Sequence, residues 1–188
     1  NGENIISIGD FSDIKAGAGR VIDATGLTVS PGFIDTYAHS DGAVLLDPQH
    51  ANGLRQGITT EILGQDGLSY APLSNDNYRM FRRYLAGLLG EPPEDLDMSS
   101  VSAFRSHYDG KVAINTAYCV PHGAVRLEAV GFRDVPLDGD ALEHAKRLVR
   151  EGLEQGAVGL ATGMSYLPNA WSTTDELVEL CKAADEAG

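Results

Sequence analysis

The sequence predicts an α/β protein built on a parallel sheet. Four strand-like segments are each followed by a segment of helical periodicity, which is the order of elements in parallel βα units. Titratable residues follow the carboxyl ends of these segments, where parallel α/β folds collect their functional groups. Short apolar runs between Gly-rich turns come before the first unit. We therefore expect part of a small β-sandwich domain over residues 1–30 and four βα units over residues 31–188.

The expected strands are short runs of apolar and β-branched residues. Three of them, Ile5–Ile8, Val21–Asp23 and Leu27–Val29, suit a small antiparallel sheet in the N-terminal segment. Pro31 and Gly32 then interrupt the chain before the first βα unit. The strands expected in the four units are Phe33–Tyr37, Ile58–Leu63, Val112–Val120 and Val158–Thr162.

Helices are expected where apolar residues recur at helical spacing. Asp47 would cap the first helix and Gly57 would end it. Thr173 and Glu176 form a capping box for the last one. The expected helices are Pro48–Gln56, Asp76–Leu89, Val101–Tyr108, Asp140–Gln155 and a final helix that runs from Thr173 to Ala187.

The stretch Ser30–Asp41 joins a strand directly to polar residues. If the extended chain continues, alternation places the polar side chains of Asp35, Tyr37, His39 and Asp41 on one side. Buried carboxylates and imidazoles are costly unless they are paired or hold a metal, so such a cluster indicates a functional strand end. A polar surface loop remains the alternative.

Composition excludes several classes of function. An apolar fraction of 43% in 188 residues is enough for a real core. A formal charge of -13 disfavours nucleic acid and anionic membranes as partners, because both bind through clustered Lys and Arg. The sequence shows neither a membrane span nor a secretion signal, so we expect a cytoplasmic protein.

Four motifs carry a resemblance to a known family. Pro31-Gly-Phe-Ile-Asp35, followed by a run that contains His39, resembles the first barrel strand of the amidohydrolase superfamily, which reads Pro-Gly-Phe-Ile-Asp-x-His-x-His. The stretches 64–73, 121–126 and 159–168 resemble segments of one branch, the D-aminoacylases or N-acyl-D-amino-acid deacylases. The resemblance covers essentially the whole chain. It implies the N-terminal portion of a (β/α)8 TIM-type barrel, with both ends of the chain expected to be truncated.

The resemblance also implies a zinc site. His39 matches the second His of the strand motif, and Asp66 stands where those enzymes have a metal-binding Cys, so both are expected metal ligands. Tyr37 occupies the place of the first His, and we expect it, His122 and Tyr166 to contact substrate. The general base, like two further metal-binding His residues, is expected downstream of Gly188. The catalytic residue is therefore unknown, and the segment alone is expected to be inactive.

Each site residue has a simpler alternative. Asp66, which lies close to Gly64 and Gly67, fits an ordinary turn. His39 fits a polar loop, and His122 and Tyr166 fit roles in bracing a loop or packing on the barrel rim.

The implied activity is hydrolysis of the amide bond of N-acyl-D-amino acids, small molecules that would be the main partner. The segment 159–168 offers no Lys or Glu for the bridging group of hydantoinases and dihydroorotases, which favours the D-aminoacylase branch. Two alternatives stay open. One is an amidohydrolase that acts on a different linear or cyclic amide, and the other is a non-catalytic binding protein of the same fold. A homo-oligomer is compatible with all three.

Overall fold

The computed structural model describes residues 4, 5, 7–9 and 20–188, and the chain divides into two compact units, 1–31 and 32–188. In the described part of the first unit, the chain forms a turn at Thr25 and Gly26 but no strand. The strands expected at Val21–Asp23 and Leu27–Val29 are therefore wrong. Their apolar side chains stay exposed, and no segment within the described residues pairs with them in a ladder, without which a strand is not stable. The run Ile5–Ile8 includes a residue outside the described part.

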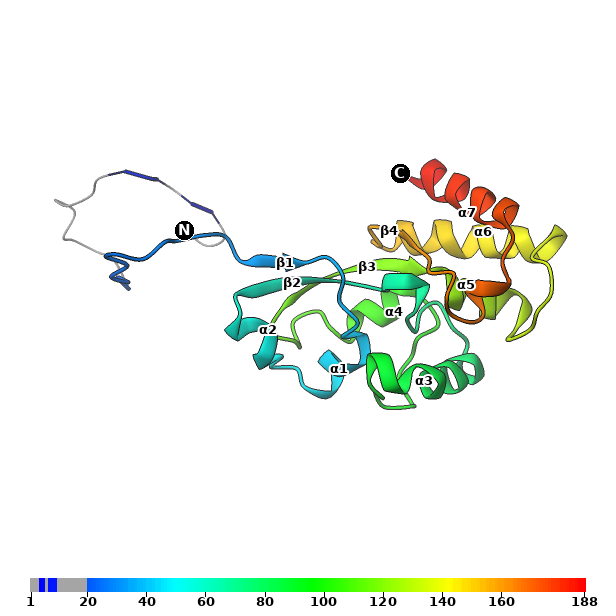
Figure 1. Cartoon of the computed structure of the whole chain (residues 1–188), viewed down its shortest axis with the longest axis horizontal. Coiled ribbons are helices and arrows are strands. Elements are labelled where there is room, and N and C mark those ends of the chain that lie inside the picture. Colours follow the sequence, from blue (N-terminus) through cyan, green and yellow to red (C-terminus); the bar gives the residue numbers. More distant parts are fainter. Residues whose placement is uncertain (1–3, 6, 10–19) are drawn as a thin grey trace. The chain divides into compact units, whose positions relative to one another are not determined.

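The second unit is a half-barrel of four parallel strands (Figure 1). The strands pair in chain order, and their carboxyl ends lie at one edge of the curled sheet. This confirms the parallel βα arrangement that the sequence predicts. The strands are β1 Phe33–Asp35, β2 Ile58–Leu63, β3 Asn115–Pro121 and β4 Gly159–Ala161.

Seven helices and two 3-10 turns join these strands in the described chain. The α-helices are α1 Asp41–Leu46, α2 Ala51–Arg55, α3 Asn75–Leu89, α4 Val101–Ser106, α5 His122–Val130, α6 Gly139–Glu154 and α7 Thr174–Ala187. The 3-10 turns are η1 Gln65–Gly67 after β2 and η2 Asn169–Trp171 before α7.

Two helices were not expected from the sequence. Helix α1 begins six residues after the end of β1, and Asp47 closes it at its C-terminus instead of capping the next helix. Helix α5 begins at His122, immediately after the last residue of β3. Its residues are almost all buried, so its sequence lacks the separate apolar and polar faces by which a surface helix is predicted.

Close packing of helices holds the sheet. Helix α6 buries Ala145, Val149 and Gly152, and a methyl group on Gly152 would lie 2.6 Å from Cγ2 of Val120 in β3. Tyr118 in β3 donates a hydrogen bond of 2.7 Å to the carbonyl oxygen of Ala71 and accepts one of 3.2 Å from its amide. These contacts fix the segment after η1 against the sheet.

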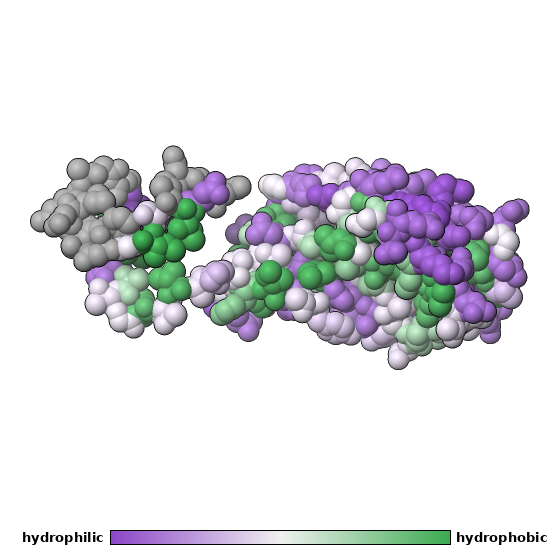
Figure 2. All heavy atoms as spheres, turned by 90° about the horizontal axis from the view of Figure 1, so that it is seen from above, coloured by the Kyte–Doolittle hydropathy of each residue, from purple (hydrophilic) through white to green (hydrophobic). Residues whose placement is uncertain are grey.

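On the face shown in Figure 2, polar side chains cover a large part of the second unit. Apolar side chains are nevertheless exposed on the two edge strands or beside them, where Phe33, Ile34 and Val158 are about 60% exposed. In the described part of the chain, none of the helices combines the length and the apolar character needed to cross a membrane.

Candidate functional site

Three of the predicted site residues meet at the carboxyl ends of β1 and β2. The Tyr37 hydroxyl donates a hydrogen bond of 2.5 Å to Oδ2 of Asp66. Nε2 of His39 lies 3.4 Å from the same oxygen. The rings of Tyr37 and His39 contact edge to face, with their centroids 5.2 Å apart. We call Tyr37, His39 and Asp66 the strand-end cluster.

The strand-end cluster is partly open to solvent. The side chains of His39 and Asp66 are each 18% exposed, whereas Tyr37 is 59% exposed. The hydrogen bond to Asp66 raises the pKa of Tyr37, and desolvation and the nearby charges of Asp66 and Tyr166 act in the same direction. Tyr37 is therefore a neutral donor at ordinary pH. Nδ1 of His39 is buried without a hydrogen-bond partner, so this ring has an unused polar atom.

Asp41 does not join the strand-end cluster but binds the segment that follows β2. Strand β1 ends at Asp35, whose Oδ1 accepts the amide of Tyr37, and α1 then takes Asp41 into the interior. The expectation that alternation holds all four polar residues on one side is wrong, because the extended chain stops six residues earlier than Asp41. In the interior, Oδ1 of Asp41 accepts hydrogen bonds from the Gly64 amide at 3.0 Å and from the Ser69 hydroxyl at 2.6 Å. Burial raises the pKa of Asp41 to about 6, although these hydrogen bonds oppose the shift.

A second buried group, which the sequence did not reveal, lies beneath α1 and α2. Glu61 of β2 is only 3% exposed and receives a hydrogen bond from the Ser40 hydroxyl. Its Oε1 lies 2.6 Å from Nε2 of His50. The burial of Glu61 could not be predicted from hydrophobic periodicity. A charged residue within the stretch Ile58–Leu63 is normally expected to face solvent.

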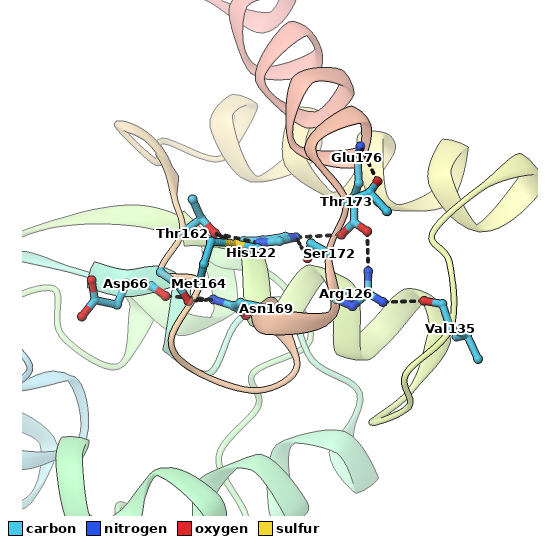
Figure 3. A network of polar contacts seen from close by, with 11 residues as sticks. Asp66, His122, Arg126, Val135, Thr162, Met164, Asn169, Ser172, Thr173 and Glu176 are labelled. Atoms are coloured by element: carbon cyan, nitrogen blue, oxygen red, sulfur yellow. Dashed lines mark hydrogen bonds and ion pairs between the residues drawn. The ribbon is translucent and has the colours of Figure 1, made fainter.

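His122 lies elsewhere, in a buried polar network that joins α5, β4 and α7 (Figure 3). Its side chain is fully buried, with Nδ1 2.8 Å from Oγ1 of Thr162 and Nε2 2.9 Å from Oε1 of Glu176. Arg126, also fully buried, donates to the other carboxylate oxygen of Glu176. These contacts are the ones expected if His122 braces a loop, which was the simpler alternative. Its role in substrate binding stays a prediction.

Ser172 is not the nucleophile of a Ser-His-Glu triad in this network. Ser172 Oγ lies 3.3 Å from Nε2 of His122, but Glu176 contacts that same nitrogen. A triad places the carboxylate and the nucleophile on opposite ring nitrogens. The only side chain bonded to Nδ1 here is the hydroxyl of Thr162 among the described residues.

Tyr166 is half-buried and lies in the loop after β4. It lines a hollow of about 260 Å³ together with Leu68 and Tyr84. Its phenol is also among the groups that raise the pKa of Tyr37. Its role in substrate binding stays a prediction.

No family model matches the chain. Known proteins with similar sequences, however, include deacylases of N-acyl-D-amino acids. The chain is 30% identical to a D-aminoacylase from Alcaligenes xylosoxydans xylosoxydans, over 100% of this chain and 37% of the relative. It is 35% identical to an N-acyl-D-glutamate deacylase from the same organism, again over 100% of this chain and 37% of the relative. The chain thus spans about a third of the length of these curated relatives.

A solved structure extends the likeness to the fold. The N-acyl-D-glutamate deacylase of Bordetella bronchiseptica, crystallised with zinc and a phosphonate mimic of the tetrahedral intermediate, superposes with a TM-score of 0.72 and 31% identity. The match covers 83% of this chain and 32% of that one. The chain is therefore a homologue, over a part of their length, of the D-aminoacylases and N-acyl-D-amino-acid deacylases.

Proposed function

We propose that this chain belongs to a zinc-dependent hydrolase that cleaves the amide bond of N-acyl-D-amino acids and releases a carboxylate and a free D-amino acid. The observation that carries the proposal is the approach of His39 to Asp66 at 3.4 Å, at the strand ends of a chain homologous to such enzymes. Tyr37 and Tyr166 flank this pair and are proposed to contact the substrate. His122 is fully buried and bonded to Thr162, and we propose that it contributes to substrate binding through the loop after β4.

The donor atoms of the pair suit zinc. An imidazole nitrogen and a carboxylate oxygen are both common zinc ligands. The unpaired Nδ1 of His39 shows that the protein leaves this ring short of one partner. Among residues 4, 5, 7–9 and 20–188, no third His, Cys, Asp or Glu completes a metal site. The proposal therefore requires ligands in addition to His39 and Asp66.

A bound zinc would polarise the scissile carbonyl and lower the pKa of a water molecule, which are the two requirements of amide hydrolysis at neutral pH. The residues of this chain would supply ligands and shape. Asp66 carries negative charge to the strand end, and Tyr37 holds the position of its Oδ2 through the phenol.

One observation supports a non-catalytic relative as the second candidate. Oδ2 of Asp66 is already engaged by Tyr37, which stands where the resembled enzymes have a metal-binding His. A carboxylate held by a neutral donor is a weaker ligand. An amidohydrolase with another amide substrate remains the third candidate.

The test is the zinc content and the substrate range of the whole protein. We expect about one tightly held zinc per chain and turnover of N-acetyl-D-amino acids in preference to the L isomers. His39→Ala and Asp66→Ala should remove both properties, whereas His144→Ala, at a half-buried histidine of α6, should remove neither. Failure to bind zinc when it is supplied would favour the non-catalytic candidate. Zinc binding with turnover of cyclic amides alone would favour the third.

Cytoplasmic location is also proposed, and fractionation of cells would test it. Self-association is proposed for this segment on its own, because apolar side chains of its edge strands are exposed, and light scattering on the segment would test it.

A further inference from the structure

The loop that carries Asp66 has an unusual backbone. Asp66 lies in the left-handed region, with φ 56° and ψ 14°, between Gly64 at φ 82° and Gly67 at φ 68°. Left-handed residues are uncommon outside glycine, although Asp and Asn adopt this region more readily than most others. The Leu68 amide closes the turn with a hydrogen bond of 3.0 Å to the carbonyl oxygen of Gln65, and the left-handed residues inside the turn depend on contacts from the surrounding structure.

Asn169 supplies the contact from outside the loop. Its Nδ2 donates 2.9 Å to the carbonyl oxygen of Asp66 and 3.2 Å to that of Gly163, and it thereby joins the loops after β2 and β4 (Figure 3). Because both acceptors are carbonyl oxygens, only the NH2 group of the amide can face them. In Figure 3 the Asp66 carboxylate points away from Asn169. Asn169 therefore contacts the main chain of Asp66 and not its carboxylate, which faces Tyr37 and His39.

The amide of Asn169 is satisfied on one side only. The residue is fully buried, and its Oδ1 has no hydrogen-bond partner among the described residues. A buried acceptor without a partner is destabilising and offsets much of the stability that two neutral hydrogen bonds contribute. The stability of the fold is thus a poor explanation for an asparagine at this position, and its donor group toward Asp66 is a better one.

Glycines bring the same two loops into contact. A methyl group on Gly163 would lie 2.8 Å from Cβ of Asp66. One on Gly67 would lie 2.8 Å from the carbonyl oxygen of Ala161 and from Nδ2 of Asn169. Close approach therefore leaves Asp66 no room to shift toward β4, while Asn169 prevents it from moving away.

We propose that Asn169 is a positioning residue that fixes the main chain of Asp66 and so aims its carboxylate toward His39. This inference rests on the proposed function, in which Asp66 is a zinc ligand. Asn169 touches neither zinc nor substrate. Its contribution is to orient the carboxylate of Asp66. If that orientation is lost, zinc binding becomes weaker while the protein still folds.

The experiment measures zinc affinity by competition with a chelating dye, together with thermal unfolding without zinc, on the whole protein. Asn169→Ala removes the donor, and Gly163→Ala displaces Asp66 while Asn169 remains. Both should weaken zinc binding about tenfold or more. Ser172→Ala lies in the same segment but contacts His122, and a methyl group on Gly159 meets only Sγ of Cys119, at 3.9 Å. Ser172→Ala and Gly159→Ala should therefore leave zinc affinity within about twofold.

An Asp66→Ala variant separates this inference from the proposed function. If Asp66→Ala leaves zinc affinity unchanged, the ligand role of Asp66 fails, and the positioning role of Asn169 fails with it. If Asp66→Ala loses zinc while Asn169→Ala and Gly163→Ala retain it, only the positioning role is overturned. In support, Asn169→Ala should add nothing to the loss in Asp66→Ala. Should Asn169→Ala fail to fold, Gly163→Ala with its Gly159→Ala control decides alone.

Discussion

The phenol of Tyr37 donates its hydrogen bond to the carboxylate of Asp66 across 29 positions of sequence, at 2.5 Å. It thereby connects the loop after β1 to the loop after β2. The accepting oxygen, Oδ2, is also the one that faces Nε2 of His39. A metal held between His39 and Asp66 would therefore share or replace the bond from Tyr37, which makes Tyr37 a competitor for the ligand atom.

Replacement of Tyr37 tests this competition. Tyr37→Phe removes the donor and frees Oδ2, so we expect zinc affinity to rise about three- to tenfold, in line with the net contribution of an ordinary hydrogen bond. Tyr37→His should in addition allow a second metal to bind. Titration with zinc in a chelator-buffered solution measures both effects. Tyr84→Phe, at another exposed tyrosine that accepts the Leu167 amide, is the control and should change nothing. A fall in affinity for Tyr37→Phe would mean that the phenol assists the site.

The fold could be predicted wherever local pattern and tertiary packing agree. Strand β2 has the predicted limits, and α6 matches its prediction to within one residue at each end, because both have a clear buried face. Thr173 caps α7 as predicted by accepting the Glu176 amide. The side chain of Glu176 does not close the capping box and instead binds His122 and Arg126. Long-range electrostatics decided that choice, and no local pattern shows it.

The candidate site could be predicted in part for the same reason. Parallel strands bring their ends together, so the meeting of His39 and Asp66 follows from strand order alone. The buried supports could not be found, because Asp41 and Asn169 look like ordinary loop or cap residues until their distant partners are known. Both carry a side-chain oxygen that is buried and unpaired.

Helix packing on the sheet is testable at Gly152. A methyl group there would lie 2.6 Å from Cγ2 of Val120 and 3.2 Å from Cγ2 of Val101, so Gly152→Ala overpacks the contact of α6 with β3. We expect the free energy of unfolding to fall by about 1–3 kcal/mol. Gly87→Ala in α3 is the control, since its methyl group meets open space and alanine favours a helix by about 1 kcal/mol. Urea denaturation should move the two variants in opposite directions, and equal shifts would contradict this packing.

The buried charges of Glu176 and Arg126 give a prediction about stability and pH. Burial tends to raise the pKa of Glu176, but the hydrogen bonds and charges of His122 and Arg126 outweigh it and lower that pKa. Because the folded pKa is below the ordinary value of 4.5, the stabilisation is present above that pH and is lost as pH falls through the folded pKa. Glu176→Gln leaves the Arg126 charge unpaired, and we expect a loss of about 3–5 kcal/mol at pH 7.

Two comparisons check that prediction. Chemical denaturation at several pH values should show the stability of Glu176→Gln approaching that of the original protein as pH drops below the usual carboxyl range. Glu179→Gln removes a partly exposed carboxylate one turn along α7, paired with Lys146 and Lys182, and should cost no more than about 1 kcal/mol. A constant difference at all pH values would show that the carboxylate charge is not what Glu176 contributes.

Asp66 offers the sharpest test, because its backbone and its carboxylate make separate demands. Asn accepts the left-handed conformation about as well as Asp, so Asp66→Asn should change the free energy of unfolding by less than about 0.5 kcal/mol. Cys does not, so Asp66→Cys should lose about 1–2 kcal/mol. Zinc binding should follow the reverse order, since a thiolate is a zinc ligand and a neutral amide is a poor one. Denaturation and zinc titration on the same samples measure both rankings. If Asp66 serves only as a turn residue, Asp66→Asn would keep full zinc affinity and activity.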